Sequence, residues 1–238
     1  MDDNLQATLR DLLRRGAEPN AVLDLLVRDY QRFHLVLVLV SGLFLALLLA
    51  VGVALCRSWG RARHGGDPSR RFERRALAVG AVLACSVPLL LAVVVAANVS
   101  TVLSPRQGFT GSVRLLGAPA EGTRAAAVQE SVTTWLAGAR AGQVPAPLER
   151  AIDDRLSWQR PKAVTTTVLL VVVSGLGVLA WRRLVRRTRR SGGRTTARDL
   201  PLLLGGCAAV PVAFVLMLMV MGNTQGALAP LSLTLFLG

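Results

Sequence analysis

Four long stretches of the chain contain no Asp, Glu, Lys or Arg. They cover residues 34–55, 76–98, 163–181 and 200–222. An α-helix rises about 1.5 Å per residue, so about 20 apolar residues cross the roughly 30 Å hydrocarbon core of a bilayer. Each stretch has this length, and together they leave little chain for a separate soluble core. The pattern predicts an all-α integral membrane protein with four transmembrane helices.

Two shorter segments outside these stretches have the periodicity of an amphipathic helix. Their apolar residues recur at i, i+4, i+7 and i+8, which places them on one helix face. The residues are Leu5, Leu9, Leu12 and Leu13 in the first segment, and Val128, Val132, Trp135 and Leu136 in the second. Stripes this narrow do not fold alone, so we expect them to pack on each other, on the membrane surface or on a partner protein. The candidate partner-docking residues are therefore Leu5, Leu9, Leu12, Val128, Val132 and Trp135.

The two halves of the chain carry similar short segments in the same order. LVSGLF at 39–44 corresponds to VVSGLG at 172–177. The other pairs are RRGAEP at 14–19 with RAGQVP at 140–145, YQR at 30–32 with WQR at 158–160, and NVSTVLSP at 98–105 with NTQGALAP at 223–230. This order predicts a tandem duplication. Its parts are repeat one at 1–105, a linker at 106–127 and repeat two at 128–238.

Each repeat is predicted to contain a short amphipathic helix pair followed by a transmembrane hairpin. Two spans per repeat make both copies enter the membrane in the same direction. The two tandem hairpins should therefore be related by a pseudo-two-fold axis along the membrane normal. The copies differ at Pro161, where we expect a helix break before the third span, because proline lacks the N–H of a helical hydrogen bond. For residues 231–238 the sequence leaves a short strand and an interfacial segment as alternatives.

The distribution of charge along the chain predicts how the protein is oriented in the membrane. The sequence has 28 basic and 14 acidic residues, and Lys162 is the single lysine. Arginines are concentrated in two short loops, at 56–75 and 182–199. Because cytoplasmic loops are enriched in basic residues, we expect both loops to face the cytoplasm and both termini to lie outside. The loops are candidate sites for anionic lipid, whereas nucleic-acid binding is not expected, since no regular aromatic residues accompany the charges.

The use of arginine in place of lysine is typical of a high-GC bacterial genome. Together with the four spans and the basic loops, it predicts a multi-pass protein of a bacterial plasma membrane.

Recognisable catalytic chemistry is missing from the sequence. The chain has two histidines and three cysteines, without metal-ligand, disulfide or CxxC spacing. None of the usual motifs for metalloprotease, nucleophilic-elbow or phosphate-loop chemistry occurs. We therefore expect no enzyme activity, no cofactor and no metal site.

Small residues and prolines are the remaining features of the spans. Ser41–Gly42 and Ser174–Gly175 could allow two helices to approach closely, or could line a ligand cleft. Pro88 and Pro211 occupy corresponding positions in the second and fourth spans, where they could kink the helices and free backbone carbonyls.

Two functions follow from these patterns as alternatives. The first is a non-enzymatic accessory or scaffold subunit of a membrane complex, which docks partners through its external amphipathic helices and its Arg-rich loops. The second is a small transporter, channel or hydrophobic-ligand carrier that uses the Pro88 and Pro211 region. The partners expected are the lipid bilayer, anionic lipid, and either a protein partner or further copies of the chain.

Overall fold

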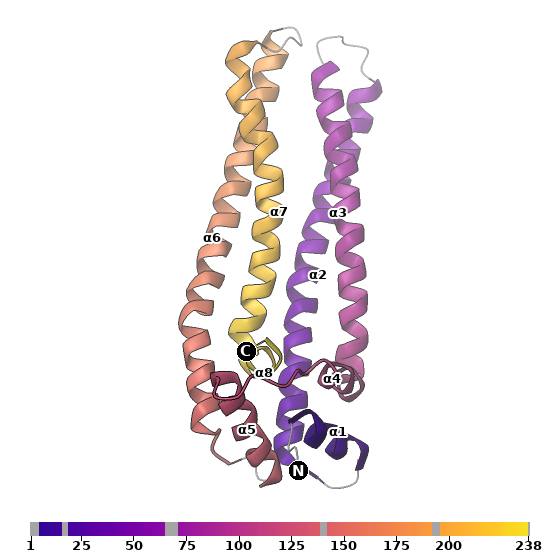
Figure 1. Ribbon diagram of the computed structural model, residues 1–238. Helices are drawn as coiled ribbons and strands as arrows, with labels where there is room; N and C mark the ends of the chain where they lie inside the picture. Colours follow the sequence, from indigo (N-terminus) through magenta and orange to yellow (C-terminus); the bar gives the residue numbers. More distant parts are fainter. Residues whose placement is uncertain (1–4, 16–18, 65–70, 139–141, 192–195, 238) are drawn as a thin grey trace. The chain divides into compact units, whose positions relative to one another are not determined.

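The computed structural model describes residues 5–15, 19–64, 71–138, 142–191 and 196–237 (Figure 1). These residues are almost entirely helical and contain no strand. The elements in chain order are α1 (Leu5–Arg15), α2 (Ala21–His64), α3 (Arg71–Leu103), α4 (Pro105–Val113), α5 (Arg124–Ala137), α6 (Ala146–Arg190), the 3₁₀ turn η2 (Ala197–Asp199), α7 (Leu200–Leu228) and α8 (Pro230–Leu237). The predicted all-α class is confirmed.

The four long helices α2, α3, α6 and α7 are long and apolar enough to cross a membrane. Each contains one of the four charge-free stretches predicted from the sequence. Many of their apolar side chains are exposed, for example Leu43 at 69%, Leu89 at 70% and Val171 at 68%. In water such exposure would be costly, whereas contact with lipid tails satisfies these side chains.

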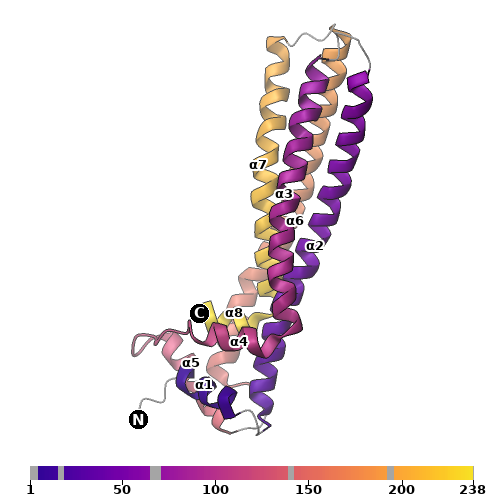
Figure 2. The same ribbon diagram turned by 90° about the vertical axis from the view of Figure 1, so that its right-hand side faces the viewer.

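The chain divides into two compact units, which are described separately. Unit 1 comprises Met1–Val38, Ala96–Ala163 and Gly222–Gly238, and it contains all four short helices. Unit 2 comprises Leu39–Val95 and Val164–Met221, and it contains the central parts of the long helices. Within unit 2 these four helices run alongside one another in both views (Figures 1 and 2).

Unit 1 has a hydrophobic core to which both halves of the chain contribute. Its buried residues are Leu5, Leu9, Val22, Leu23, Leu26, Val27, Tyr30, Phe109, Val113, Leu116, Val128, Val132, Trp135, Leu136, Leu148 and Leu235. Apart from Leu116, which follows α4, they come from α1, α2 and α4 in the first half, and from α5, α6 and α8 in the second. Each helix buries a single face, so the core forms only when the helices pack together.

Three aromatic rings form the contact between α2, α4 and α8. The ring centroids of Tyr30 and Phe109 are 5.5 Å apart, those of Phe109 and Phe236 are 5.8 Å apart, and those of Tyr30 and Phe236 are 6.3 Å apart. All three pairs have the edge-to-face geometry that aromatic quadrupoles favour. Gly108 lies beside this cluster, where an added Cβ would be only 2.8 Å from Cγ2 of Thr101. A larger residue there would therefore push α4 away from its neighbours.

Side-chain caps fix how the helices of unit 1 begin and end. The Oδ1 atom of Asn20 accepts hydrogen bonds from the backbone N–H groups of Val22 and Leu23, at 3.1 and 3.0 Å. These groups have no partner within α2, so Asn20 caps the helix. Its Nδ2 atom donates to the backbone oxygen of Leu136 at the end of α5, at 2.9 Å. One side chain thus joins the start of α2 to the end of α5.

One local prediction is wrong, and the structure adds detail to two others. Helix α6 continues through Pro161 without a break, because one lost hydrogen bond, which costs about 3 kcal/mol, is outweighed by the long runs of helix on both sides. Within the predicted linker 106–127, residues 106–113 belong to α4 and residues 124–127 to α5, and the residues between them are not helical. The tail 231–238, left open between a strand and an interfacial segment, forms helix α8 up to Leu237.

Candidate functional site

The carboxyl-terminal end of α6 presents a dense arginine surface. Every arginine between Trp181 and Ser191 is exposed, namely Arg182, Arg183, Arg186, Arg187, Arg189 and Arg190. Leu184 and Thr188, four residues apart on the opposite face, are 0% and 2% exposed. The helix end is therefore amphipathic, with one face buried in unit 2 and a cationic face turned outward.

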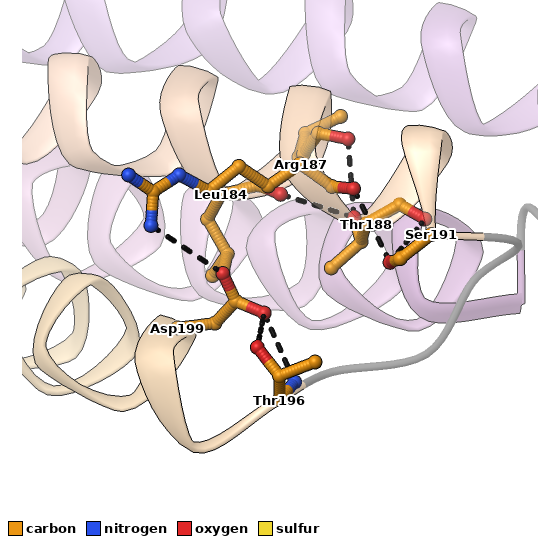
Figure 3. Close-up of polar contacts among 7 residues, drawn as sticks. Leu184, Arg187, Thr188, Ser191, Thr196 and Asp199 are labelled. Atoms are coloured by element: carbon orange, nitrogen blue, oxygen red, sulfur yellow. Dashed lines mark hydrogen bonds and ion pairs between the residues drawn. The ribbon is translucent and has the colours of Figure 1, made fainter.

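Asp199 connects the start of α7 to this helix end (Figure 3). It is buried, and its Oδ2 atom accepts hydrogen bonds from the backbone N–H and the hydroxyl of Thr196, both at 2.9 Å. Its Oδ1 atom lies 3.8 Å from a guanidinium nitrogen of Arg187. A carboxylate at this place also suits the positive end of the α7 dipole. Asp199 therefore holds together the two helix ends that meet at this loop.

Hydroxyl groups bond to backbone carbonyls near the end of α6 in the same cluster (Figure 3). The Thr188 hydroxyl donates toward the backbone oxygens of Leu184 and Val185, both at 3.1 Å. The Ser191 hydroxyl donates toward those of Arg187 and Thr188, both at 3.2 Å. Thr188 lies in the last turn of α6, where carbonyls lack a partner within the helix, so the Ser191 hydroxyl supplies one for it. The other three bonds go to Leu184, Val185 and Arg187, where hydroxyls of a helix commonly bond back to the preceding turn.

This end of α6 carries a strong excess of positive charge. Asp199 is the only acidic residue between Arg182 and Asp199, and its two oxygens already have partners. The guanidinium fork has a geometry that matches phosphate and carboxylate groups, so this surface is a candidate site for anions. Among the described residues no group of three His, Cys, Asp or Glu side chains could hold a metal ion. Cys56 and Cys207 are exposed free thiols.

The small residues and prolines singled out in the spans have unequal surroundings. Ser41 is buried and Gly42 is partly buried, whereas Ser174 and Gly175 are exposed. A Cβ added at Gly42 or Gly175 would meet nothing within 4 Å. Close helix contacts occur elsewhere, as at Gly177, where a Cβ would lie 2.9 Å from that of Ala209. The structure does not bring the two Ser-Gly pairs together.

The two prolines also differ in their surroundings. Pro88 is buried and Pro211 is exposed, and α3 and α7 each continue through their proline. They therefore do not form a matched pair of helix breaks.

The residues predicted to dock a partner lie inside unit 1. Leu5 and Leu9 are 1% and 0% exposed, Val128 and Val132 are 5% and 0%, and Trp135 is 9%. Leu12 is partly buried against the same core. We expected the two apolar stripes to pack on each other, on the membrane surface or on a partner protein. In the structure they pack on each other and on the rest of the unit 1 core.

Two glutamines have structural roles that were not predicted from the sequence. Gln31 donates its side-chain N–H to the backbone oxygen of Val102 at 2.9 Å, and Gln159 approaches that of Gly222 at 3.5 Å. Each thus reaches from the first long helix of its half to the second. They are the central residues of the matched YQR and WQR segments. The repeated Gln, between an aromatic residue and an arginine in both segments, is a sequence signal for this helix-to-helix contact.

A shallow groove runs along α5 and the start of α6. Its volume is about 520 Å³, and Ser131, Thr134, Trp135, Pro145 and Pro147 are among its lining residues. The indole N–H of Trp135 is buried there without a hydrogen-bond partner. Within unit 1 this groove is a surface that a partner could cover. Comparison with protein-family models, with curated proteins and with solved structures found no match for the chain.

Proposed function

We propose that the chain is a non-enzymatic, multi-pass membrane protein that serves as an accessory or scaffold subunit of a membrane complex. Unit 1 is its docking domain outside the bilayer, and the arginine-rich loops bind anionic lipid on the other side. The observation that carries the proposal is the single core of unit 1, built by helices from both halves of the chain. A shared core gives the outer helices a fixed surface on which a partner can assemble.

The groove along α5 is the docking surface in this proposal. It combines an apolar floor that includes Trp135 with the polar groups Glu130, Ser131 and Thr134. This mixture of an aromatic residue with hydrogen-bonding neighbours is typical of protein interfaces. Leu5 and Val128, which the sequence predicts as docking residues, are buried in the core. The groove along α5 is therefore proposed as the docking surface in their place.

A tandem duplication is part of the proposal, and the order of the helices supports it. Both halves contain a short helix, two long helices and a short helix, of 11, 44, 33 and 9 residues and of 14, 45, 29 and 8 residues. Pro105 and Pro230, matched in the sequence, each begin the last helix of their half. Two such halves would form tandem hairpins with both termini on one side of the membrane.

The transporter alternative receives no specific support. It needs Pro88 and Pro211 to act as a symmetric pair of kinks. One is buried and the other exposed, and both helices continue unbroken.

Site-specific photo-crosslinking in native membranes tests the docking surface. A photoreactive residue at the exposed groove position Thr134 should give one discrete product larger than the chain. The same residue at the exposed Gln107, on α4, is the matched control and should give none. If both positions give the same products, or if Thr134 gives only uncrosslinked chain, the proposal is wrong. A product of twice the mass of the chain would indicate self-association and would also count against an accessory subunit.

Cysteine labelling tests the proposed topology separately. Cys56, Cys85 and Cys207 are first replaced by Ser, and a single cysteine is then placed at Gly65, Gly192 or Gly117. In a bacterial plasma membrane an impermeant thiol reagent should label Gly117→Cys in intact cells. It should label the other two only after the cytoplasmic side is opened. Labelling of all three from one side would overturn the topology.

A further inference from the structure

A second cavity in unit 1 lies where α5, α6 and α8 meet. Its volume is about 230 Å³, and its lining includes Arg124, Asp154, Arg155, Trp158 and Thr234. Unlike the groove along α5, it is lined by two guanidinium groups. The cavity is therefore small and cationic, and the proposed docking role does not use it.

The polar groups of this cavity favour an anion. Two arginines and one carboxylate, that of Asp154, are among the lining residues, so the cavity lining carries an excess of positive charge. One guanidinium nitrogen of Arg124 contacts the Asp154 carboxylate and the backbone oxygen of Arg150. Since a guanidinium carries five N–H donors, these contacts leave others to bind a ligand. Arg155 is half-buried in the same wall, where a charge is screened less than at an open surface.

Thr234 provides a second, independent indication of a missing partner. It is 5% exposed, and its hydroxyl has no hydrogen-bond partner. A buried hydroxyl without a partner costs free energy, and such groups usually mark a place where a ligand or water binds. Thr234 is also one of the residues that line the cationic cavity, although its hydroxyl oxygen itself is buried behind the cavity surface.

The position of the cavity along α6 indicates which oxyanion. Trp158 is 45% exposed, and the ammonium of Lys162 lies 4.3 Å from the centre of its ring. The charge-free stretch of α6 begins at the next residue, Ala163. Tryptophan and long cationic side chains at the end of an apolar stretch are typical of the headgroup layer of a bilayer.

We propose that this cavity binds the phosphodiester of an anionic phospholipid headgroup, such as that of phosphatidylglycerol. Arg124 and Arg155 hold the phosphate oxygens, and Trp158 lies against the glycerol region. The inference rests on the proposed crossing of a membrane by α6. It assigns a lipid site to the leaflet next to unit 1, away from the arginine-rich end of the same helix. Inorganic phosphate shares the chemistry and differs in lacking the acyl chains.

Native mass spectrometry of the full chain in detergent tests the site. The protein is purified with equal amounts of phosphatidylglycerol and phosphatidylcholine, and the bound lipid is counted. Wild type should retain phosphatidylglycerol in preference. Arg155→Gln, which leaves the contact between Arg124 and Asp154 intact, should weaken retention about tenfold, because a charge-assisted contact to phosphate is lost. The double variant R124Q/R155Q loses two such contacts and should weaken retention further.

The control variant R28Q/R114Q removes two exposed arginines of unit 1 that lie outside the cavity. It should retain the lipid as wild type does, and a large excess of inorganic phosphate should leave the lipid bound. Equal losses in the cavity and control variants would show that bulk charge is responsible, and absence of bound phosphatidylglycerol from wild type would refute the site. Displacement of the lipid by inorganic phosphate would assign the cavity to free phosphate. Extraction of the chain from membranes by alkaline carbonate would instead refute the membrane crossing itself.

Discussion

The carboxylate of Asp29 on α2 accepts two hydrogen bonds from Ser232 on α8, a residue 203 positions further along the chain. The backbone N–H of Ser232 lies 2.7 Å from Oδ2 and its hydroxyl lies 2.8 Å from the same atom. Ser232 is in the first turn of α8, where backbone N–H groups have no partner within the helix. A residue that precedes the first apolar stretch therefore caps the last helix. The contact joins the first long helix to the last helix of unit 1.

Replacing Asp29 should loosen α8 from unit 1. Asp29→Ala removes the acceptor for both bonds, and we expect a loss of about 1–2 kcal/mol in the free energy of unfolding. Asp29→Asn keeps one side-chain oxygen as an acceptor and removes a half-buried charge, so it should cost less. Chemical unfolding of the full chain in detergent measures both. Asp153→Asn, at an exposed carboxylate, is the control. Equal stability of Asp29→Ala and wild type would contradict the capping role.

Gly226 on α7 is required by the side chains packed against it. A Cβ at this position would overlap the side-chain amide of Gln159 and would lie 2.7 Å from Cδ2 of Leu233. Gln159 is 5% exposed and has little room to move. Gly226→Ala should therefore destabilise the protein by about 1–3 kcal/mol, as overpacked cores do.

Gly222, one helical turn earlier, is the matched control for this substitution. A Cβ there would meet nothing within 4 Å, so Gly222→Ala should be neutral or should stabilise the helix by up to about 1 kcal/mol. The double variant G226A/Q159A should recover part of the loss, because it removes the side chain that the new methyl group meets. Equal effects of Gly226→Ala and Gly222→Ala on thermal unfolding would refute the steric explanation.

The helices could be predicted from the sequence because they depend on local signals. A charge-free run of sufficient length specifies a membrane-crossing helix wherever it packs, and the four predicted stretches each lie in one long helix. The spacing of Leu5 and Leu9 likewise indicated a helix with one apolar face. What covers that face depends on α4 and α5, which the sequence places more than 95 residues away. The local pattern therefore specified the stripe without specifying its partner.

The contacts between helices were harder to predict because similar segments have different neighbours. Ser41 is buried whereas Ser174 is exposed, although both belong to the same short sequence match. Pro161 would end an isolated helix, but α6 continues through it because the helix on both sides compensates for one missing bond. The arginine-rich loops could be located from the amino-acid composition alone. The contacts of Asp199 with Thr196 and Arg187, at the second loop alone, depend on a geometry that composition does not encode.

Phe109 should be among the most sensitive positions of the core of unit 1. It is 1% exposed and contacts the rings of both Tyr30 and Phe236. Phe109→Ala should lower the free energy of unfolding by about 3–5 kcal/mol, because it leaves a cavity between three helices. Leu115→Ala is the control, since Leu115 is 85% exposed and should contribute within about 0.5 kcal/mol. Similar unfolding curves for the two variants would show that this core does not support unit 1.

Two adjacent glycines on α7 allow a sharp test of packing in unit 2. The indole N–H of Trp181 donates to the backbone oxygen of Gly206 at 3.2 Å, and a Cβ added at Gly206 would lie 2.9 Å from that indole nitrogen. A Cβ added at Gly205 would meet nothing within 4 Å. Gly206→Ala should therefore displace the ring and cost about 1–3 kcal/mol, whereas Gly205→Ala should not.

The stability difference between these two variants should depend on Trp181. In a Trp181→Phe background the ring is smaller and the hydrogen bond is already absent, so most of the penalty of Gly206→Ala should disappear. Thermal unfolding of the four single and double variants, in one detergent, gives the coupling between the two positions. An unchanged penalty in the Phe background would mean that Gly206 is needed for a reason other than the indole. Because Trp181 and Gly206 lie on α6 and α7, the coupling measures how tightly these two long helices pack.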